Sequence, residues 1–203
     1  MRRLLAFVQI IVVLSVFSMA HGAEWTPLQV SLVHPVQLFS KTTPVQGLRI
    51  NLIYGANEKV DGIDCGLVNR VTQESKGMQL GALPFGGANI TKDLQGLQLA
   101  GLVAGINVAD GEAAGLQVSG LFMGFNKAHA MTGIQLSAFV GINVADDMKG
   151  AQLAFLCNRA VTAQGLQIGI VNVCERMQGI QIGVVNIIKE GRVPVFPIVN
   201  AQF

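Results

Sequence analysis

The chain has 203 residues, of which 51% are hydrophobic, only 13% are charged and 24 are glycine. An ordinary soluble domain carries roughly 25% charged residues, so this composition excludes a disordered or polyelectrolyte chain, and the length suits one domain. The formal net charge is +2 and comes from Arg2 and Arg3, because the rest of the chain has 12 basic and 12 acidic residues. A neutral chain has no electrostatic footprint for nucleic acid, so we expect no nucleic-acid partner.

Residues 1–22 are predicted to be a signal peptide. Two arginines precede an apolar run over residues 4–17, and small residues follow that run, which is the pattern of an export signal. Cleavage after Gly22 and cleavage after Ala20 both fit the small-residue rule. A retained anchor helix is the alternative, since the apolar segment is just short of the roughly 20 residues that cross a bilayer. We therefore expect an exported protein of the periplasm, outer membrane or cell surface.

Residues 23–203 are predicted to form a single β-repeat domain. The repeats occupy about residues 47–191, and the flanks 23–46 and 192–203 differ from them in being rich in Pro, Phe and Val. Atypical ends of a repeat array are typical of caps, and proline opposes edge-to-edge pairing. The flanks are therefore interpreted as caps.

The repeat unit is a glycine, an aliphatic residue, a glutamine, a second aliphatic residue, a short apolar run and an asparagine, as in GLQIGIVN at residues 165–172. Seven close copies begin at Gly77, and two diverged copies begin at Gly47 and Gly62. The structural repeat positions are Gln79, Gln98, Gln117, Gln135, Gln152, Gln167, Gln181, Asn107, Asn126, Asn143, Asn158, Asn172 and Asn186.

Spacing within the repeat separates two parts. The distance from glycine to asparagine varies between about 7 and 12 residues, whereas the distance from asparagine to the next glycine stays at about 7 or 8, and most charges lie in this second part. The pattern predicts a variable apolar strand alternating with a polar connector. Period-two alternation and abundant Val and Ile favour strands, and the recurrent glycines would each cost a helix about 1 kcal/mol. The fold class is therefore all-β.

A glutamine between two aliphatic residues points to the opposite face of a strand from both of them. If the repeats stack in register, amides of successive repeats can form ladders in which each side chain donates to one neighbour and accepts from the other. Such ladders satisfy polar groups that are otherwise costly to bury. The alternative is that glutamine faces water and asparagine tolerates a turn.

Two architectures fit the repeats. The favoured one is a tandem-repeat β-solenoid with Pro-rich caps, in which each repeat is one coil. The alternative is a small outer-membrane β-barrel of about ten strands. The apolar segment 99–106 and the terminal Phe203 favour this alternative. A barrel also predicts alternating connector lengths, aromatic girdles and strands of about 9 to 11 residues, and these features are not visible in the repeats.

Four segments resemble a known family. GLQIGIVN at 165–172, PLQVSL at 27–32, GLRINLIYG at 47–55 and VFPIVN at 195–200 resemble the exported bacterial proteins called surface repeat-containing proteins, first named from spirochaetes. The resemblance covers nearly the whole chain after the predicted signal and implies a Gram-negative-type cell envelope. It implies no catalytic residues, because that family has no established activity. Arg49 and Asp64 depart from the repeat by replacing its glutamine in the first two copies.

We predict no catalytic, cofactor-binding or metal-binding residues. The histidines lie in unrelated repeats without Cys or carboxylates at ligand spacing, and the acidic pairs at 110–112 and 146–147 are interpreted as solvated turns. Cys65, Cys157 and Cys174 are interpreted as small buried hydrophobes, with a bridge between the last two as the alternative.

The expected function is that of a non-catalytic structural or interaction protein of the cell envelope, and not of an enzyme. Its partner would be an unknown envelope protein, a polysaccharide or a membrane. A pore or anchor built on the barrel is the alternative function.

Overall fold

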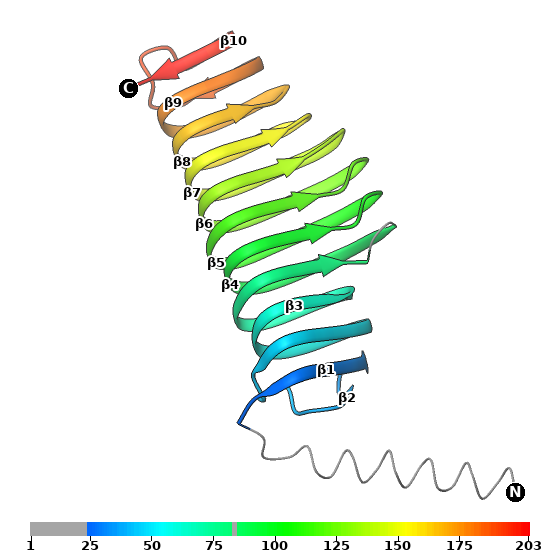
Figure 1. Cartoon of the computed structure of the whole chain (residues 1–203). Helices are drawn as coiled ribbons and strands as arrows, with labels where there is room; N and C mark the ends of the chain where they lie inside the picture. Colours follow the sequence, from blue (N-terminus) through cyan, green and yellow to red (C-terminus); the bar gives the residue numbers. More distant parts are fainter. Residues whose placement is uncertain (1–23, 83–84) are drawn as a thin grey trace, which may run out of the picture.

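The computed structural model describes residues 24–82 and 85–203, so the predicted signal peptide at 1–22 lies outside the described residues. The described chain is all-β and winds into a β-solenoid whose coils stack along one axis (Figure 1). The strands are β1 (Thr26–Val33), β2 (Val36–Gln37), β3 (Val45–Gly81), β4 (Gly86–Ala100), β5 (Ala104–Ser119), β6 (Met123–Ser137), β7 (Val140–Ala154), β8 (Cys157–Ile168), β9 (Val171–Ile188) and β10 (Val195–Gln202).

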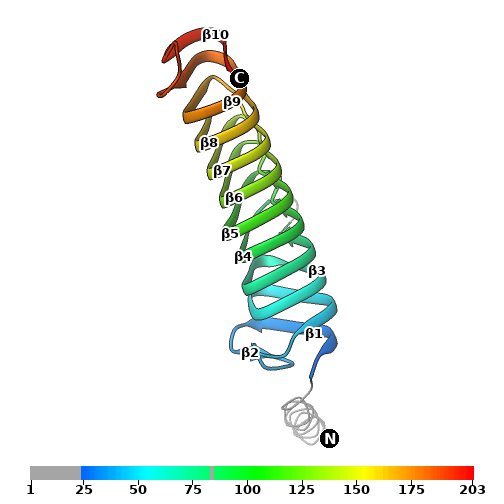
Figure 2. The same ribbon diagram turned by 90° about the vertical axis from the view of Figure 1, so that its left-hand side faces the viewer.

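Strand pairing confirms the solenoid. Each strand from β3 to β8 pairs in parallel with the next one along the chain, and β1 pairs in parallel with β3. The alternative barrel needs antiparallel neighbours throughout, so it is wrong for the described residues. Antiparallel pairs occur only with the short β2 and with β10 at the two ends of the described sheet. The predicted caps therefore lie at the ends of the stack, as Figure 2 shows from the side.

Each coil is a flattened loop with two arms, as β5 illustrates. Its first arm ends with Asn107 and Ala109, the chain bends at the acidic residues 110–112, and the second arm runs from Gly115 through Gln117. The bend at 110–112 belongs to what we call the charged edge. The opposite side, which we call the apolar edge, consists of the turns at 101–103, 120–122, 138–139, 155–156 and 169–170.

The predicted boundaries of the strands were wrong. The polar connectors were expected to separate the strands, but β5 passes through residues 110–112 without interruption, and the breaks lie inside the apolar segments, at 101–103 and 120–122. The physical reason is that polarity reports which residues face water, and not where the backbone turns. Since the turns of the apolar edge carry Leu, Val and Phe, hydropathy does not distinguish them from strand.

The interior has three zones between the edges. Next to the charged edge lies a hydrophobic cluster made mainly of small residues and methionines, which includes Ala109, Met131, Met148 and Cys174. The repeat glutamines and asparagines come next and are fully buried. Glycine, alanine and serine fill the narrow space under the apolar edge, as at Ser137.

A column of glycines starts the second arm of every coil. Each has a positive φ, for example +135° at Gly133, and in the register Gly133 lies directly on Gly115. A Cβ built on Gly133 would overlap the carbonyl oxygen of Gly115. Glycine is required here for two reasons, because the φ is unfavourable for other residues and because no space exists for a side chain.

Candidate functional site

The seven repeat glutamines form one continuous ladder along the stack. The side-chain Nε2 of Gln117 donates to Oε1 of Gln98 at 2.7 Å, and Nε2 of Gln135 donates to Oε1 of Gln117 at 2.8 Å. The pattern continues in the same direction to Gln181. A second hydrogen bond crosses the interior from four of these amides to a backbone carbonyl of the facing arm, as from Gln135 to Val144 at 3.3 Å; the others start at Gln117, Gln152 and Gln181.

The repeat asparagines form a second ladder on the facing arm, with the opposite polarity. Nδ2 of Asn107 donates to Oδ1 of Asn126 in the next coil at 2.9 Å, so asparagine donors point toward the C-terminal end of the stack and glutamine donors toward the N-terminal end. Asn107 also donates across to the carbonyl of Val118 at 2.7 Å. The two rows of amide dipoles therefore oppose one another, and both tie the arms together.

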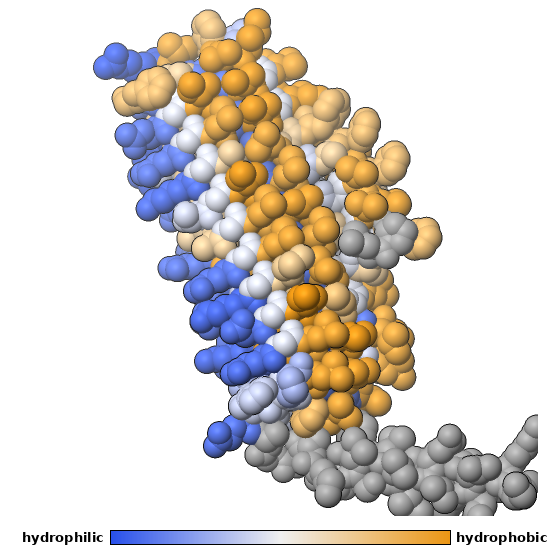
Figure 3. All heavy atoms as spheres, viewed as in Figure 1, coloured by the Kyte–Doolittle hydropathy of each residue, from blue (hydrophilic) through white to orange (hydrophobic). Residues whose placement is uncertain are grey.

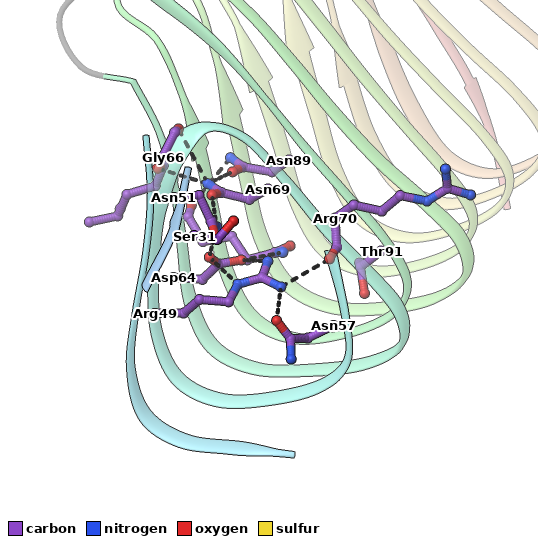
Figure 4. A network of polar contacts seen from close by, with 12 residues as sticks. Ser31, Arg49, Asn51, Asn57, Asp64, Gly66, Asn69, Arg70, Asn89 and Thr91 are labelled. Carbon is purple, nitrogen blue, oxygen red and sulfur yellow. Dashed lines mark hydrogen bonds and ion pairs between the residues drawn. The ribbon is translucent and has the colours of Figure 1, made fainter. Parts of the chain in front are cut away.

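The glutamine ladder begins at a buried ion pair, which replaces the amide in the first two copies (Figure 4). Asp64 accepts from Nε2 of Gln79 at 3.1 Å and from Nδ2 of Asn51 at 2.9 Å. Arg49 donates to both carboxylate oxygens, at 2.7 and 2.5 Å. A ladder whose donors all point one way must start on a group that only accepts, and a carboxylate is such a group.

Both members of this pair are fully buried, so neither charge is stabilised by water. The remaining donors of Arg49 are satisfied by Oδ1 of Asn57 at 3.2 Å and by the carbonyl of Arg70 at 3.1 Å. Each nitrogen of the Arg49 guanidinium is thus hydrogen-bonded, and such pairing makes a buried ion pair tolerable. The departure of Arg49 and Asp64 from the repeat is therefore the starting point of the ladder, and not a break in it.

The ends of the ladders are incompletely satisfied. Oε1 of Gln181 and Oδ1 of Asn51 have no hydrogen-bond partner among the described residues. These two atoms are the acceptor ends of the two rows, where no further amide donates. An amide in the middle of a ladder therefore both donates to one neighbouring amide and accepts from the other, whereas the amide at the acceptor end has a neighbour on one side only.

Side chains that point out of the solenoid are apolar, in contrast to the buried amides. The aliphatic residues on either side of each glutamine, such as Ile134 and Leu136, point out of the solenoid and are 44% and 41% exposed. The same holds on the first arm for Ile106, which is 47% exposed. Figure 3 shows the result for one face, with a hydrophilic margin along the charged edge and a broad hydrophobic area beside it.

Phenylalanines project from the apolar edge. Phe122 and Phe139 stack with ring centroids 5.9 Å apart, and Phe139 and Phe155 follow at 6.0 Å. Phe85, Phe122, Phe139 and Phe155 are all more than half exposed. Leaving such rings in water is unfavourable, and a large exposed apolar patch marks an interaction site or a groove.

The cysteines are free in the structure. Cys174 is fully buried in the hydrophobic cluster, and burial raises the pKa of its thiol to about 11. Cys65 and Cys157 are half-buried, and burial raises the pKa of each thiol as well.

The acidic pairs at 110–112 and 146–147 lie on separate coils, formed by β5 and β7. His129 contacts Asp146 of the next coil at 2.7 Å, and both are exposed. Among the described residues no group of three or more His, Cys, Asp or Glu is placed to hold a metal ion. Within that same part of the chain there is also no helix long and apolar enough to cross a membrane.

Sequence reasoning identified the amide positions and the buried ladder, which directs the flanking aliphatic residues outward, so the alternative of water-facing glutamines is wrong. It did not identify the apolar edge as a turn. The sequence did carry a signal of an apolar outer surface. The apolar segments lack charged residues on both faces of the expected strands, whereas an ordinary half-buried strand has polar residues on its outer face.

Comparison with known proteins finds no family model, no curated protein and no solved structure that matches this chain.

Proposed function

We propose that this chain is a non-catalytic structural or interaction protein of the cell envelope that acts through the outer surface of its solenoid. The observation that carries the proposal is the inverted polarity of the coils. Repeated amides such as Gln117 are buried and bonded to one another, while aliphatic residues such as Leu136 face outward. A surface of this extent requires a partner that covers it.

The interior offers little for chemistry on a small molecule. The amides donate to their neighbours in the stack and to carbonyls of the opposite arm, so their hydrogen-bonding capacity is used within the fold. The glycine column brings successive backbones too close for a ligand to enter between coils. Polar groups engaged in this way support the fold, and function is left to the outside of the coils.

The envelope location is supported by the export pattern of residues 1–22 and by the resemblance to surface repeat-containing proteins. An exported protein with an apolar outer surface meets its partner in the periplasm, at the outer membrane or at the cell surface. This part of the proposal is tested by expressing the full chain in a Gram-negative host. The expected result is an intact mass that has lost residues 1–22 or 1–20, in the envelope fraction. Full-length protein in the cytoplasm would contradict it, and Val13→Asp, which interrupts the apolar run, is the export-blocked control.

The surface role is tested by two matched substitutions. Leu136→Glu places a charge on the outer face, and we expect the variant to move from the envelope fraction to the soluble fraction. Thr132→Glu places the same charge on an exposed residue near the charged edge of the same coil, and we expect it to behave like the unmodified chain. Equal retention of both variants would refute a role for the apolar face.

A further inference from the structure

Charged residues are confined to one part of each coil. In the seven close repeats no charged residue stands between an opening glycine and the next asparagine, as in GLQVSGLFMGFN at 115–126. In the structure this stretch forms the outer half of the second arm, the apolar edge and the facing half of the first arm. Its outward side chains among the described residues are aliphatic, aromatic, methionine or, at Cys157, a thiol. Two faces and the edge between them are thus apolar.

We propose that this surface inserts edgewise into one leaflet of a phospholipid bilayer, with the apolar edge deepest and the charged edge in water. The inference rests on the proposed function, and it names the partner of that same surface. A second copy packed face to face would cover one face and leave the other face and the apolar edge exposed. Only a fluid apolar medium closes around three contiguous sides at once.

The depth of the apolar zone matches a leaflet. The second arm takes five residue steps from Gly115 to the turn at Gly120, and four steps from Gly165 to Gly169. At roughly 3.3 Å per residue of strand, these distances are about 17 and 13 Å. Half of a hydrocarbon core of roughly 30 Å is about 15 Å. The phenylalanines of the apolar edge would therefore lie near the middle of the bilayer.

Backbone hydrogen bonds at the apolar edge also suit lipid. Polar backbone groups in hydrocarbon must be satisfied within the protein, because no water is present to pair with them. The turns keep bonds between coils although they leave regular strand geometry: Val140 donates its N–H to the carbonyl of Phe122 at 2.9 Å, and Ile170 to that of Phe155 at 2.9 Å. Turns that face water do not require this continuity.

The border between the apolar and charged zones is basic. Two columns form it, one directly after each repeat asparagine and one directly before each repeat glycine. Between Asn69 and Gly179 the charged residues of these two columns are Arg70, Lys76, Lys127, Lys149 and Arg159, and the acidic residues of the same stretch all lie farther out, on the charged edge. Asp61, before Gly62 in a diverged copy, is the acidic exception in these columns. Basic side chains at the level of the headgroups extend toward lipid phosphates, so the border fits the surface of a phospholipid leaflet.

Flotation of the purified, processed chain with vesicles of phosphatidylcholine and phosphatidylglycerol at 3:1 tests the insertion. We expect the protein to float with the vesicles and to keep a β spectrum in circular dichroism. Phe139→Asp should lower the bound fraction by about tenfold or more, because a charge is costly deep in lipid, whereas Thr132→Asp should change it less than about twofold. Both side chains are exposed, so neither substitution disturbs the interior.

Quenching by phospholipids brominated in the acyl chains tests the orientation. Phe139→Trp and His129→Trp, each combined with Trp25→Phe, place a single fluorophore on the apolar edge and on the charged edge. We expect strong quenching of the first and little of the second. Equal quenching of the two, or equal binding of the two aspartate variants, would overturn the edgewise orientation.

Failure of the lipid inference is distinguishable from failure of the proposed function. No flotation, together with concentration-dependent self-association in the absence of lipid, would show that copies of the chain cover this surface. That result overturns insertion and leaves an envelope interaction protein standing. Unprocessed protein in the cytoplasm would instead remove the proposed function, whatever the purified chain does with vesicles.

Discussion

Replacement of Gln135 by leucine is expected to destabilise the fold strongly, because this residue is in the middle of the glutamine ladder. Leucine keeps most of the volume but removes the amide. Oε1 of Gln117 then loses its donor, and Nε2 of Gln152 loses the acceptor that it contacts at 2.8 Å. Each buried polar group left without a partner costs about 1 to 3 kcal/mol, so we expect a loss of about 2 to 6 kcal/mol in the free energy of unfolding.

The ladder predicts how this cost depends on position. Gln181→Leu removes the last rung, where Oε1 of Gln167 is the one ladder amide atom that loses its partner, so about half of the middle cost is expected. The double variant Gln117→Leu with Gln135→Leu leaves two groups unpaired, on Gln98 and Gln152, as the single variant does. Its cost should therefore be close to that of Gln135→Leu alone and well below the sum of the two single costs.

Urea unfolding in mild detergent, followed by far-ultraviolet circular dichroism, measures these free energies. Gln164→Leu is the matched control, because Gln164 is exposed near the charged edge and its replacement should change stability by less than about 0.5 kcal/mol. The reasoning is refuted if Gln135→Leu unfolds at the same urea concentration as this control. Additive costs in the double variant would show that the amides act separately and not as a ladder.

Three further predictions concern single features of the coil. Asp64→Asn leaves the charge of Arg49 buried without a counter-charge and should cost about 3 to 5 kcal/mol in urea unfolding, and the double replacement of both residues by glutamine should recover most of that loss by extending the ladder. Gly133→Ala should lower the free energy of unfolding by at least about 1 to 3 kcal/mol because of its positive φ, while Gly111→Ala should cost less, because its new Cβ meets the movable side chain of Asp93 and lies 3.2 Å from the carbonyl oxygen of Lys92. Cys174 should alkylate at pH 8 more slowly than the other two cysteines, because burial and a pKa of about 11 keep its thiol protonated, and site-resolved mass spectrometry that found it the fastest would contradict this.

Much of the fold and of the ladder positions could be predicted from the sequence. The recurrence of Gly, Gln and Asn at matching positions implies coils stacked in register, and the pairing of Gln98 with Gln117 across β4 and β5 follows that register. The role of Arg49 and Asp64 could not be predicted in this way. They break the repeat pattern, and only their distance in space shows that an arginine and a carboxylate 15 residues apart form one ion pair.

The sequence by itself determined the period of the repeat, its all-β class and the residues that recur in columns. Only the tertiary structure decided which side of the strands is the interior and where the coils turn. Alternation places Gln135 opposite Ile134 and Leu136, but it does not say which face is buried. Stacked coils bring identical amides within hydrogen-bonding distance of one another, so amides can be buried at low cost and the aliphatic residues are left to face outward.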